Sequence, residues 1–203
     1  MNWLPIEQRT KAWYDYKVAK IGGTGLGQAI SSRENSLLYV LLNQQLDGYI
    51  MPSEYENDDM IYGLEHEEEA FDDYEKKSGI KFQRGGVIVS DFFPNISMAS
   101  PDAVNIELGI VGECKCTRFG EKQIQRFVKG PETSMIPQII NYFVQSDTIR
   151  EVHWFSWCEN RPERKIVERI YKPSDFKTEI IKGRYALKEI EQELIKLHQS
   201  FIF

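Results

Sequence analysis

The sequence predicts an α/β domain of the α+β kind, with a central mixed β-sheet flanked by helices. Three observations support this prediction. Helical patterns come first along the chain, a cluster of short β-like runs follows from Gly85, and a further helix with two more strands comes after it. That order places helices on the faces of a sheet. Because no internal repeat, low-complexity tract or Gly/Ser linker interrupts residues 1–203, we expect a single domain.

The first part of the chain is predicted to be mostly helical. The expected helices cover residues 6–20, 36–46 and 60–77. The glycine-rich run from Ile21 to Gly27 separates the first two, and we expect it to be a flexible turn that presents Thr24. Asp47-Gly48 ends the second helix and Gly79 ends the third.

The middle of the chain is predicted to form strands. The four runs Gly86–Ser90, Ile96–Ala99, Ala103–Glu107 and Ile110–Cys116 fit a meander. The remaining expected elements are a helix over Ser134–Ser146, strands over Glu151–Cys158 and Lys165–Tyr171, and a long amphipathic helix from Pro173. Pro137 fits the first turn of the Ser134–Ser146 helix, since its missing N–H costs nothing there.

Composition and length exclude several classes of protein. The chain has 203 residues, 41% hydrophobic and 28% charged, which is an ordinary globular composition and excludes disordered, collagen-like and coiled-coil proteins. No apolar run approaches the roughly 18 residues of a membrane span. Met1–Lys11 lacks the layout of a signal peptide, so we expect a cytoplasmic protein without a membrane partner. Three cysteines are too few for a disulfide framework.

Charge is distributed unevenly along the chain. The net charge of -6 argues against a protein that coats nucleic acid by charge alone. Residues 1–114 contain 9 Lys and Arg against 19 Asp and Glu, whereas residues 115–203 contain 16 against 12. An acidic half that holds metal ions and a basic half that contacts an anion would explain this split. Two solvated faces of opposite sign are the alternative.

The strand that ends at Cys116 carries the most informative residues. Because side chains alternate along a strand, Glu113 and Lys115 are expected on one face and Cys114 on the other. A turn near Gly109 would bring Asp102 beside Glu113, and two adjacent carboxylates repel each other unless a cation lies between them. Oxygen ligands favour Mg²⁺ or Mn²⁺ over zinc, and Lys115 fits metal-assisted hydrolysis of a phosphodiester. A surface strand with an ordinary Lys–Glu pair is the alternative.

Two helices add polar candidates to this group. Glu67 lies in the middle of an apolar helical stripe formed by Met60, Gly63, Leu64, Ala70, Phe71 and Tyr74. A buried carboxylate requires a partner, and a metal-bound water fits if Asp102 and Glu113 hold a cation. An arginine partner, or a position at the edge of the stripe, is the alternative. Gln138 is expected near the N-terminus of its helix, where anions are favoured, although it also fits a plain surface residue.

Six short motifs, taken in order, resemble a known family. They are Trp13-x3-Lys17, Ile21-Gly22-Gly23-Thr24, Gly63-x3-Glu67-x2-Ala70, Ser100-Pro101-Asp102, Glu113-Cys114-Lys115 and Ile136-Pro137-Gln138. Together they resemble the family of phage λ exonuclease and the YqaJ-like viral recombinases, in the PD-(D/E)xK nuclease superfamily. The resemblance implies a restriction-endonuclease-like core.

The resemblance also implies a role for each matching residue. Asp102, Glu113 and the carbonyl of Cys114 would bind Mg²⁺, with Mn²⁺ as a substitute, and Glu67 would hold a second ion. Lys115 would position and activate the attacking water. The residues implied to bind phosphate, including a 5′-terminal phosphate, are Lys17, Thr24, Ser100 and Gln138. Three positions depart from the family pattern: Lys17 replaces arginine and loses its bidentate fork, Thr24 replaces serine, and Ala103 replaces glycine.

The implied activity is that of a Mg²⁺-dependent 5′→3′ exonuclease acting on linear double-stranded DNA. It would release 5′-mononucleotides and leave 3′ single-stranded overhangs for a single-strand annealing protein of phage-type recombination. The resemblance further implies a homotrimer, encoded by a phage or prophage, in the cytoplasm of a bacterial host. The alternatives are an endonuclease of the same superfamily, such as a nickase or resolvase, and a non-catalytic scaffold that binds DNA ends during recombination.

Overall fold

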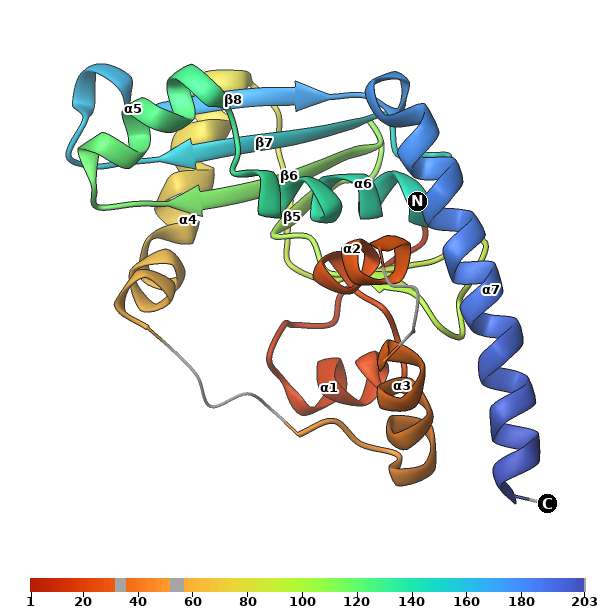
Figure 1. Ribbon diagram of the computed structural model, residues 1–203. Coiled ribbons are helices and arrows are strands. Elements are labelled where there is room, and N and C mark those ends of the chain that lie inside the picture. Colours follow the sequence, from red (N-terminus) through yellow and green to blue (C-terminus); the bar gives the residue numbers. More distant parts are fainter. Residues whose placement is uncertain (32–35, 52–56, 203) are drawn as a thin grey trace.

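A five-stranded mixed sheet forms the centre of the fold, as predicted (Figure 1). The computed structural model describes residues 1–31, 36–51 and 57–202. The strand order is β2-β5-β6-β7-β8. The strands are β2 (Gln83–Arg84), β5 (Ala103–Asn105), β6 (Ile110–Cys116), β7 (Glu151–Trp157) and β8 (Ile166–Tyr171). β6 and β7 pair in parallel and the other neighbours are antiparallel.

A second, three-stranded sheet corrects the prediction of one meander through residues 86–116. It has the order β1-β3-β4, with β1 at Trp3–Leu4, β3 at Val87–Val89 and β4 at Met98–Ala99. β4 pairs with β3, whereas β5 pairs with β6, so the chain changes sheets between Ala99 and Ala103. Pro101 lies at this change, and because proline has no N–H to donate, it interrupts a hydrogen-bonded ladder.

Helices cover both faces of the larger sheet. They are α1 (Lys11–Lys17), α2 (Gly23–Ser31), α3 (Ser36–Asp47), α4 (Asp58–Ser78), α5 (Gly120–Lys129), α6 (Ile136–Gln145) and α7 (Lys177–Ile202). Figure 1 shows α4 behind the sheet and α5 and α6 in front of it. In the part of the chain that the structure describes, no helix combines the length and apolar character needed to cross a membrane.

The first 31 residues depart from the predictions. The expected helix over residues 6–20 is shortened to Lys11–Lys17, because the Thr10 hydroxyl caps it by accepting the N–H of Trp13. The predicted flexible turn is wrong, since Gly23–Ser31 is helical. An added Cβ at Gly23 would lie 2.8 Å from Cγ of Gln138, so glycine here allows α2 to approach α6 closely.

α5 was not predicted, and it buries polar side chains while its apolar side chains are exposed. Gln123 and Arg126 face the interior, whereas Ile124 and Phe127 are exposed. Arg126 donates to Ser156 Oγ and to the carbonyl oxygen of Lys115, which satisfies its buried guanidinium. Ile124, Phe127 and Val128 recur at helical spacing, so the sequence did contain a helical signal, but these residues form the exposed side of α5.

Two hydrophobic clusters lie on the two faces of the larger sheet. On the α6 face, Val111 and Trp154 belong to a cluster that extends to α7. On the α4 face, Cys114 packs with Phe71 and Phe155. Successive residues of β6 therefore alternate as predicted, and the side chains of Glu113 and Lys115 lie on the face opposite Cys114.

The C-terminal end of α4 is fixed by a buried carboxylate. Glu75 accepts hydrogen bonds from Lys81 Nζ at 2.7 Å, Arg84 Nη1 at 2.7 Å and the N–H of Phe82 at 3.0 Å. Burial favours the neutral acid, but these donors outweigh it and lower the pKa of Glu75 to about 2. α4 ends one turn later at Gly79, whose φ of 73° and N–H bond to the Glu75 carbonyl make a left-handed cap.

Candidate active site

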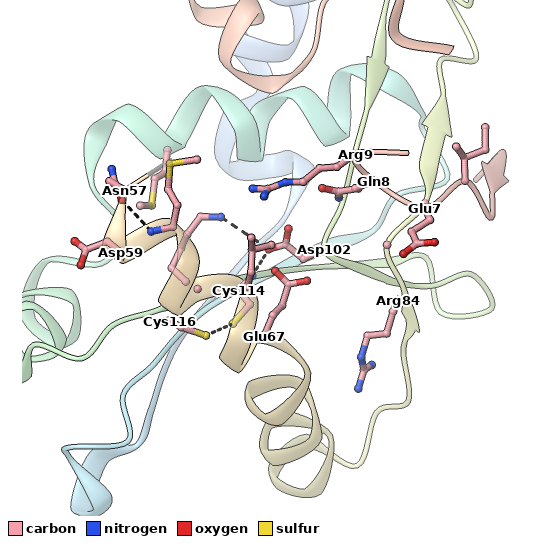
Figure 2. A pocket seen from close by; sticks show the side chains of 18 of the residues that line it. Glu7, Gln8, Arg9, Asn57, Asp59, Glu67, Arg84, Asp102, Cys114 and Cys116 are labelled. Carbon is pink, nitrogen blue, oxygen red and sulfur yellow. Dashed lines mark hydrogen bonds and ion pairs between the residues drawn. The ribbon is translucent and has the colours of Figure 1, made fainter. Parts of the chain in front are cut away.

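A cleft of about 810 Å³ opens beside the larger sheet (Figure 2). Glu67, Asp102 and Lys115 line it, together with the N-terminal segment 5–9. Glu67 is half-buried on α4. The apolar stripe predicted for this helix is buried only from Ala70 onward, and its earlier members Met60, Gly63 and Leu64 line the cleft instead. The first turns of α4 extend beyond the sheet (Figure 1).

Lys115 lies between two of the predicted carboxylates. Its Nζ is 2.5 Å from Glu113 Oε1 and 3.8 Å from Asp102 Oδ2. The antiparallel pairing of β5 with β6 places Asp102 here, and its Oδ2 accepts the N–H of Cys114 at 2.8 Å. The sequence prediction that Asp102 and Glu113 come together is therefore met through their shared lysine.

Glu113 is held by three donors. In addition to Lys115, Gln138 Nε2 donates to Oε1 at 2.8 Å and the Tyr142 hydroxyl donates to Oε2 at 2.5 Å. Glu113 is only 1% exposed, so these donors replace water for a buried charge. Sequence reasoning gave Tyr142 no role. Its spacing of four residues from Gln138 places both on one side of α6 and is the signal that was available.

Burial and the charge of Glu113 raise the pKa of both Asp102 and Glu67. Burial and the charge of Glu113 raise the pKa of Asp102 well above its usual range, against the opposing charge of Lys115. Burial raises the pKa of Glu67 as well, again with a contribution from Glu113, while Lys115 and Arg9 act in the opposite direction. Burial alone would lower the pKa of Lys115, but Glu113 and Asp102 outweigh it, so this lysine stays an ammonium.

The donor set fits a divalent cation by its chemistry. Glu67 and Asp102 line the cleft and Glu113 is buried next to it beside Lys115, and hard oxygen donors of this kind suit Mg²⁺ or Mn²⁺. Within residues 1–31, 36–51 and 57–202, however, no three His, Cys, Asp or Glu side chains are grouped closely enough to hold an ion. Lys115, Gln138 and Tyr142 engage Glu113 instead.

A second cavity, of about 290 Å³, brings together the four residues predicted to bind phosphate. Lys17, Thr24, Ser100 and Gln138 all line it. Burial lowers the pKa of Lys17, so an anion in the cavity would stabilise its charged form.

Trp13 and Lys20 add to this cavity. Trp13 Nε1 donates to Ser100 Oγ at 2.8 Å, and Lys17 Nζ lies 4.5 Å from the centre of the Trp13 ring. Burial lowers the pKa of Lys20 also. Trp13 therefore positions two of the four predicted residues, and the cavity holds a second lysine that the sequence analysis did not assign.

Gln138 connects the two cavities. It lines the small one and donates to Glu113 Oε1, which also accepts from Lys115 of the large one. Tyr142 does the same, since it lines the small cavity and donates to the other oxygen of Glu113. One helix, α6, therefore fixes the small cavity relative to Glu113 and Lys115 at the large cleft.

Solved structures share this fold. An alkaline exonuclease from Laribacter hongkongensis matches with a TM-score of 0.73 at 19% identity, over 95% of this chain and 98% of that one. A structure of the same exonuclease in complex with dAMP matches with a TM-score of 0.72 at 20% identity, with the same coverage. A phage-related exonuclease from Haemophilus somnus 129PT matches with a TM-score of 0.54 at 14% identity, over 87% of this chain and 95% of that one. The chain thus has the fold of alkaline exonucleases.

The sequence comparison identifies the family. The YqaJ-like viral recombinase domain matches residues 12–147, which include every residue predicted for the site. The chain belongs to the YqaJ-like viral recombinase family. No curated protein sequence matches the chain.

Proposed function

We propose that this chain is a Mg²⁺-dependent exonuclease that degrades linear double-stranded DNA in the 5′→3′ direction. It would release 5′-mononucleotides and leave a 3′ single strand for phage-type recombination. Family membership and the exonuclease fold support this proposal. The single observation that carries it is the connection, through Gln138, Glu113 and Lys115, between the cleft that holds Glu67 and Asp102 and the small cavity that holds Lys17 and Lys20.

In this proposal the cleft holds the metal and the scissile phosphodiester. Asp102, Glu113, Glu67 and the carbonyl of Cys114 would hold Mg²⁺, or Mn²⁺ in its place. When bound, the ion would supply Lewis-acid polarisation of the phosphate and a more acidic water. The Lys115 ammonium would donate hydrogen bonds that orient the attacking water and offset charge on the phosphate.

The small cavity would hold the 5′-terminal phosphate. Lys17 supplies charge, and the Thr24 and Ser100 hydroxyls and the Gln138 amide supply hydrogen-bond donors. Because α6 fixes this cavity relative to Glu113, a strand end bound in it places a phosphodiester in the cleft at a fixed distance from the end. That arrangement favours removal of nucleotides from an end over cleavage within a strand.

The test is a nuclease assay on three DNA substrates in parallel. Linear duplex with 5′-phosphate, linear duplex with 5′-hydroxyl and covalently closed circles are incubated with Mg²⁺, Mn²⁺ or EDTA, and released mononucleotides are measured. We expect release from the linear substrates only, faster with the 5′-phosphate, and no release in EDTA. Asp102→Asn should abolish release. Cleavage of circles would show an endonuclease, and EDTA-insensitive duplex binding without release would show a scaffold.

A matched pair of variants on α4 tests the metal assignment without relying on activity. Glu67 faces the cleft, whereas Glu65, two residues earlier on the same helix, is exposed. In the wild-type protein Mn²⁺ should raise the melting temperature. Glu67→Gln should reduce that rise and Glu65→Gln should leave it unchanged. An equal response in both variants would contradict the role of Glu67.

Two assembly features belong to the same proposal. We propose a homotrimer and a single-strand annealing partner, both by family resemblance. Light scattering of the purified chain tests the first, and copurification with a phage-type single-strand annealing protein tests the second.

A further inference from the structure

The segment before α1 forms one wall of the large cleft. Residues 5–9 line it, and the chain is fixed on both sides of Arg9. Gln8 Nε2 donates to the carbonyl of Pro101 at 3.0 Å, and the Thr10 hydroxyl donates to the carbonyl of Glu7 at 2.7 Å. Arg9 therefore has a defined place beside the Pro101-Asp102 turn.

Arg9 adopts a backbone conformation that side chains disfavour. Its φ is 64°, and among the described residues only Ala19 is another non-glycine residue with positive φ. Glycine takes this conformation without the steric cost that a Cβ brings. Residues held in such conformations cluster at functional sites, where the surrounding contacts fix them. The Arg9 side chain is therefore a candidate functional group.

The Arg9 side chain extends into the cleft, on the side of Asp102 in the view of Figure 2. Glu67 and Asp102 line the same cleft. A phosphodiester that enters this acidic end is repelled by the carboxylates, so binding there requires nearby positive charge. A guanidinium is the side chain best matched to phosphate, because it donates two parallel hydrogen bonds to the oxygens.

We propose that Arg9 binds a phosphate of the substrate strand in the large cleft, beside Glu67 and Asp102. This inference rests on the proposed function, because it requires a nucleic-acid substrate. Arg9 lies outside residues 12–147, which the family match covers. It would add a phosphate contact on the cleft side, separate from the cavity of Lys17 and Ser100.

The test uses three variants and a salt series. Arg9→Gly removes the guanidinium and suits the positive φ. Arg9→Lys keeps the positive charge but cannot donate two parallel hydrogen bonds to a phosphate. Ala19→Gly is the matched control, because it places glycine at the other positive-φ position, which lines neither cavity. Affinity for a 5′-phosphorylated linear duplex is measured by fluorescence anisotropy in EDTA, where no cleavage occurs, and melting temperatures are recorded for each variant.

We expect Arg9→Gly to weaken binding about tenfold or more and to keep or raise the melting temperature. The slope of log affinity against log salt should become shallower by about 1, as expected for one lost phosphate contact. Arg9→Lys should keep the wild-type slope with reduced affinity. Ala19→Gly should bind as the wild type does.

Wild-type affinity and salt slope in Arg9→Gly would overturn the inference. So would weaker binding with an unchanged slope, which would indicate a structural effect, or an equal loss in Ala19→Gly. Nucleotide release by the wild-type protein is measured separately. If the wild type releases nucleotides but Arg9→Gly keeps the wild-type salt slope, only the role of Arg9 is refuted. If the salt slope changes in Arg9→Gly but the wild type releases no nucleotides, the nuclease proposal is refuted and the phosphate contact is supported.

Discussion

Replacing Tyr142 by phenylalanine should weaken the site through Glu113. The change removes one hydroxyl, which is 2.5 Å from Glu113 Oε2 and belongs to a residue that is 1% exposed. A hydrogen bond to a charged group contributes about 1.5–3 kcal/mol, and its loss leaves a buried carboxylate oxygen with fewer donors. We therefore expect Tyr142→Phe to reduce the free energy of unfolding by about 2 kcal/mol.

A double-mutant cycle assigns this loss to the Glu113 contact. Urea unfolding is measured for the wild type, Tyr142→Phe, Glu113→Gln and the double variant. In Glu113→Gln the partner is neutral, and a neutral hydrogen bond contributes only about 0.5–1.5 kcal/mol. The coupling free energy should therefore be about 1 kcal/mol. Nucleotide release by Tyr142→Phe should fall as well, because Glu113 loses a donor that fixes it.

Tyr62→Phe is the control for the removal of a tyrosine hydroxyl. Among the described residues the buried Tyr62 hydroxyl has no hydrogen-bond partner, so its removal should leave stability unchanged or raise it slightly. If Tyr142→Phe costs the same with Glu113 and with glutamine at that position, the hydroxyl does not act through the carboxylate. A wild-type free energy of unfolding in Tyr142→Phe would refute the argument entirely.

Three further predictions concern helix contact, pH and metal. Gly23→Ala places a Cβ 2.8 Å from Cγ of Gln138 and should lower the free energy of unfolding in urea by about 1–3 kcal/mol. In the control Gly22→Ala the added Cβ meets nothing within 4 Å, so the free energy of unfolding should change by less than about 0.5 kcal/mol. The pKa of Glu75 is lowered to about 2, so its stabilisation is complete above its ordinary value of 4.5 and is lost as pH falls toward 2. The loss should be on the order of 2–3 kcal/mol in acid titrations of stability, and absent from Glu75→Gln. The raised pKa of Asp102 means that protons compete with the metal, so affinity for Mn²⁺ in calorimetry should keep rising with pH above the usual carboxyl range.

Each of these predictions has a result that contradicts it. Equal stability of the Gly23→Ala and Gly22→Ala proteins would show that α2 and α6 separate at no cost. An acid loss of the same size in Glu75→Gln would assign the titration to other carboxyls. Mn²⁺ affinity that levels off in the ordinary carboxyl range would mean that Asp102 is not among the ligands.

The sequence predicted best where local pattern and tertiary environment agree. The bounds of β6 were predicted residue for residue, because Ile110–Cys116 is paired on both sides and buried. The polar side of α6 was recognised as polar, but its burial was not predicted. Asn141 donates to the carbonyl of Met98 and Gln145 donates to Ser97 Oγ, and these partners come from a distant part of the chain that no helical pattern reveals.

Candidate site residues were found through their chemistry, and their surroundings were not. Asp102, Glu113 and Lys115 stand out by type and spacing, so their gathering could be predicted. The left-handed backbone at Arg9 has no signal in the sequence, since arginine is not a residue that marks positive φ. Nor does the sequence predict that the glycines of α2 serve close packing instead of flexibility, because that depends on the position of Gln138.

The place of α6 in the core bears on how such an enzyme would select its products. Its residues Ile139 and Phe143 are buried in the main cluster, while Gln138 and Tyr142 on its other side reach Glu113. A buried helix cannot move by part of the spacing between two nucleotides to fit a substrate, because close packing resists displacement. If the small cavity holds a strand end, the distance from that end to the cleft is therefore set by the fold. Such a protein would remove units of constant length from any sequence, and substitutions in the α6 core would change the rate of release before they changed the size of the product.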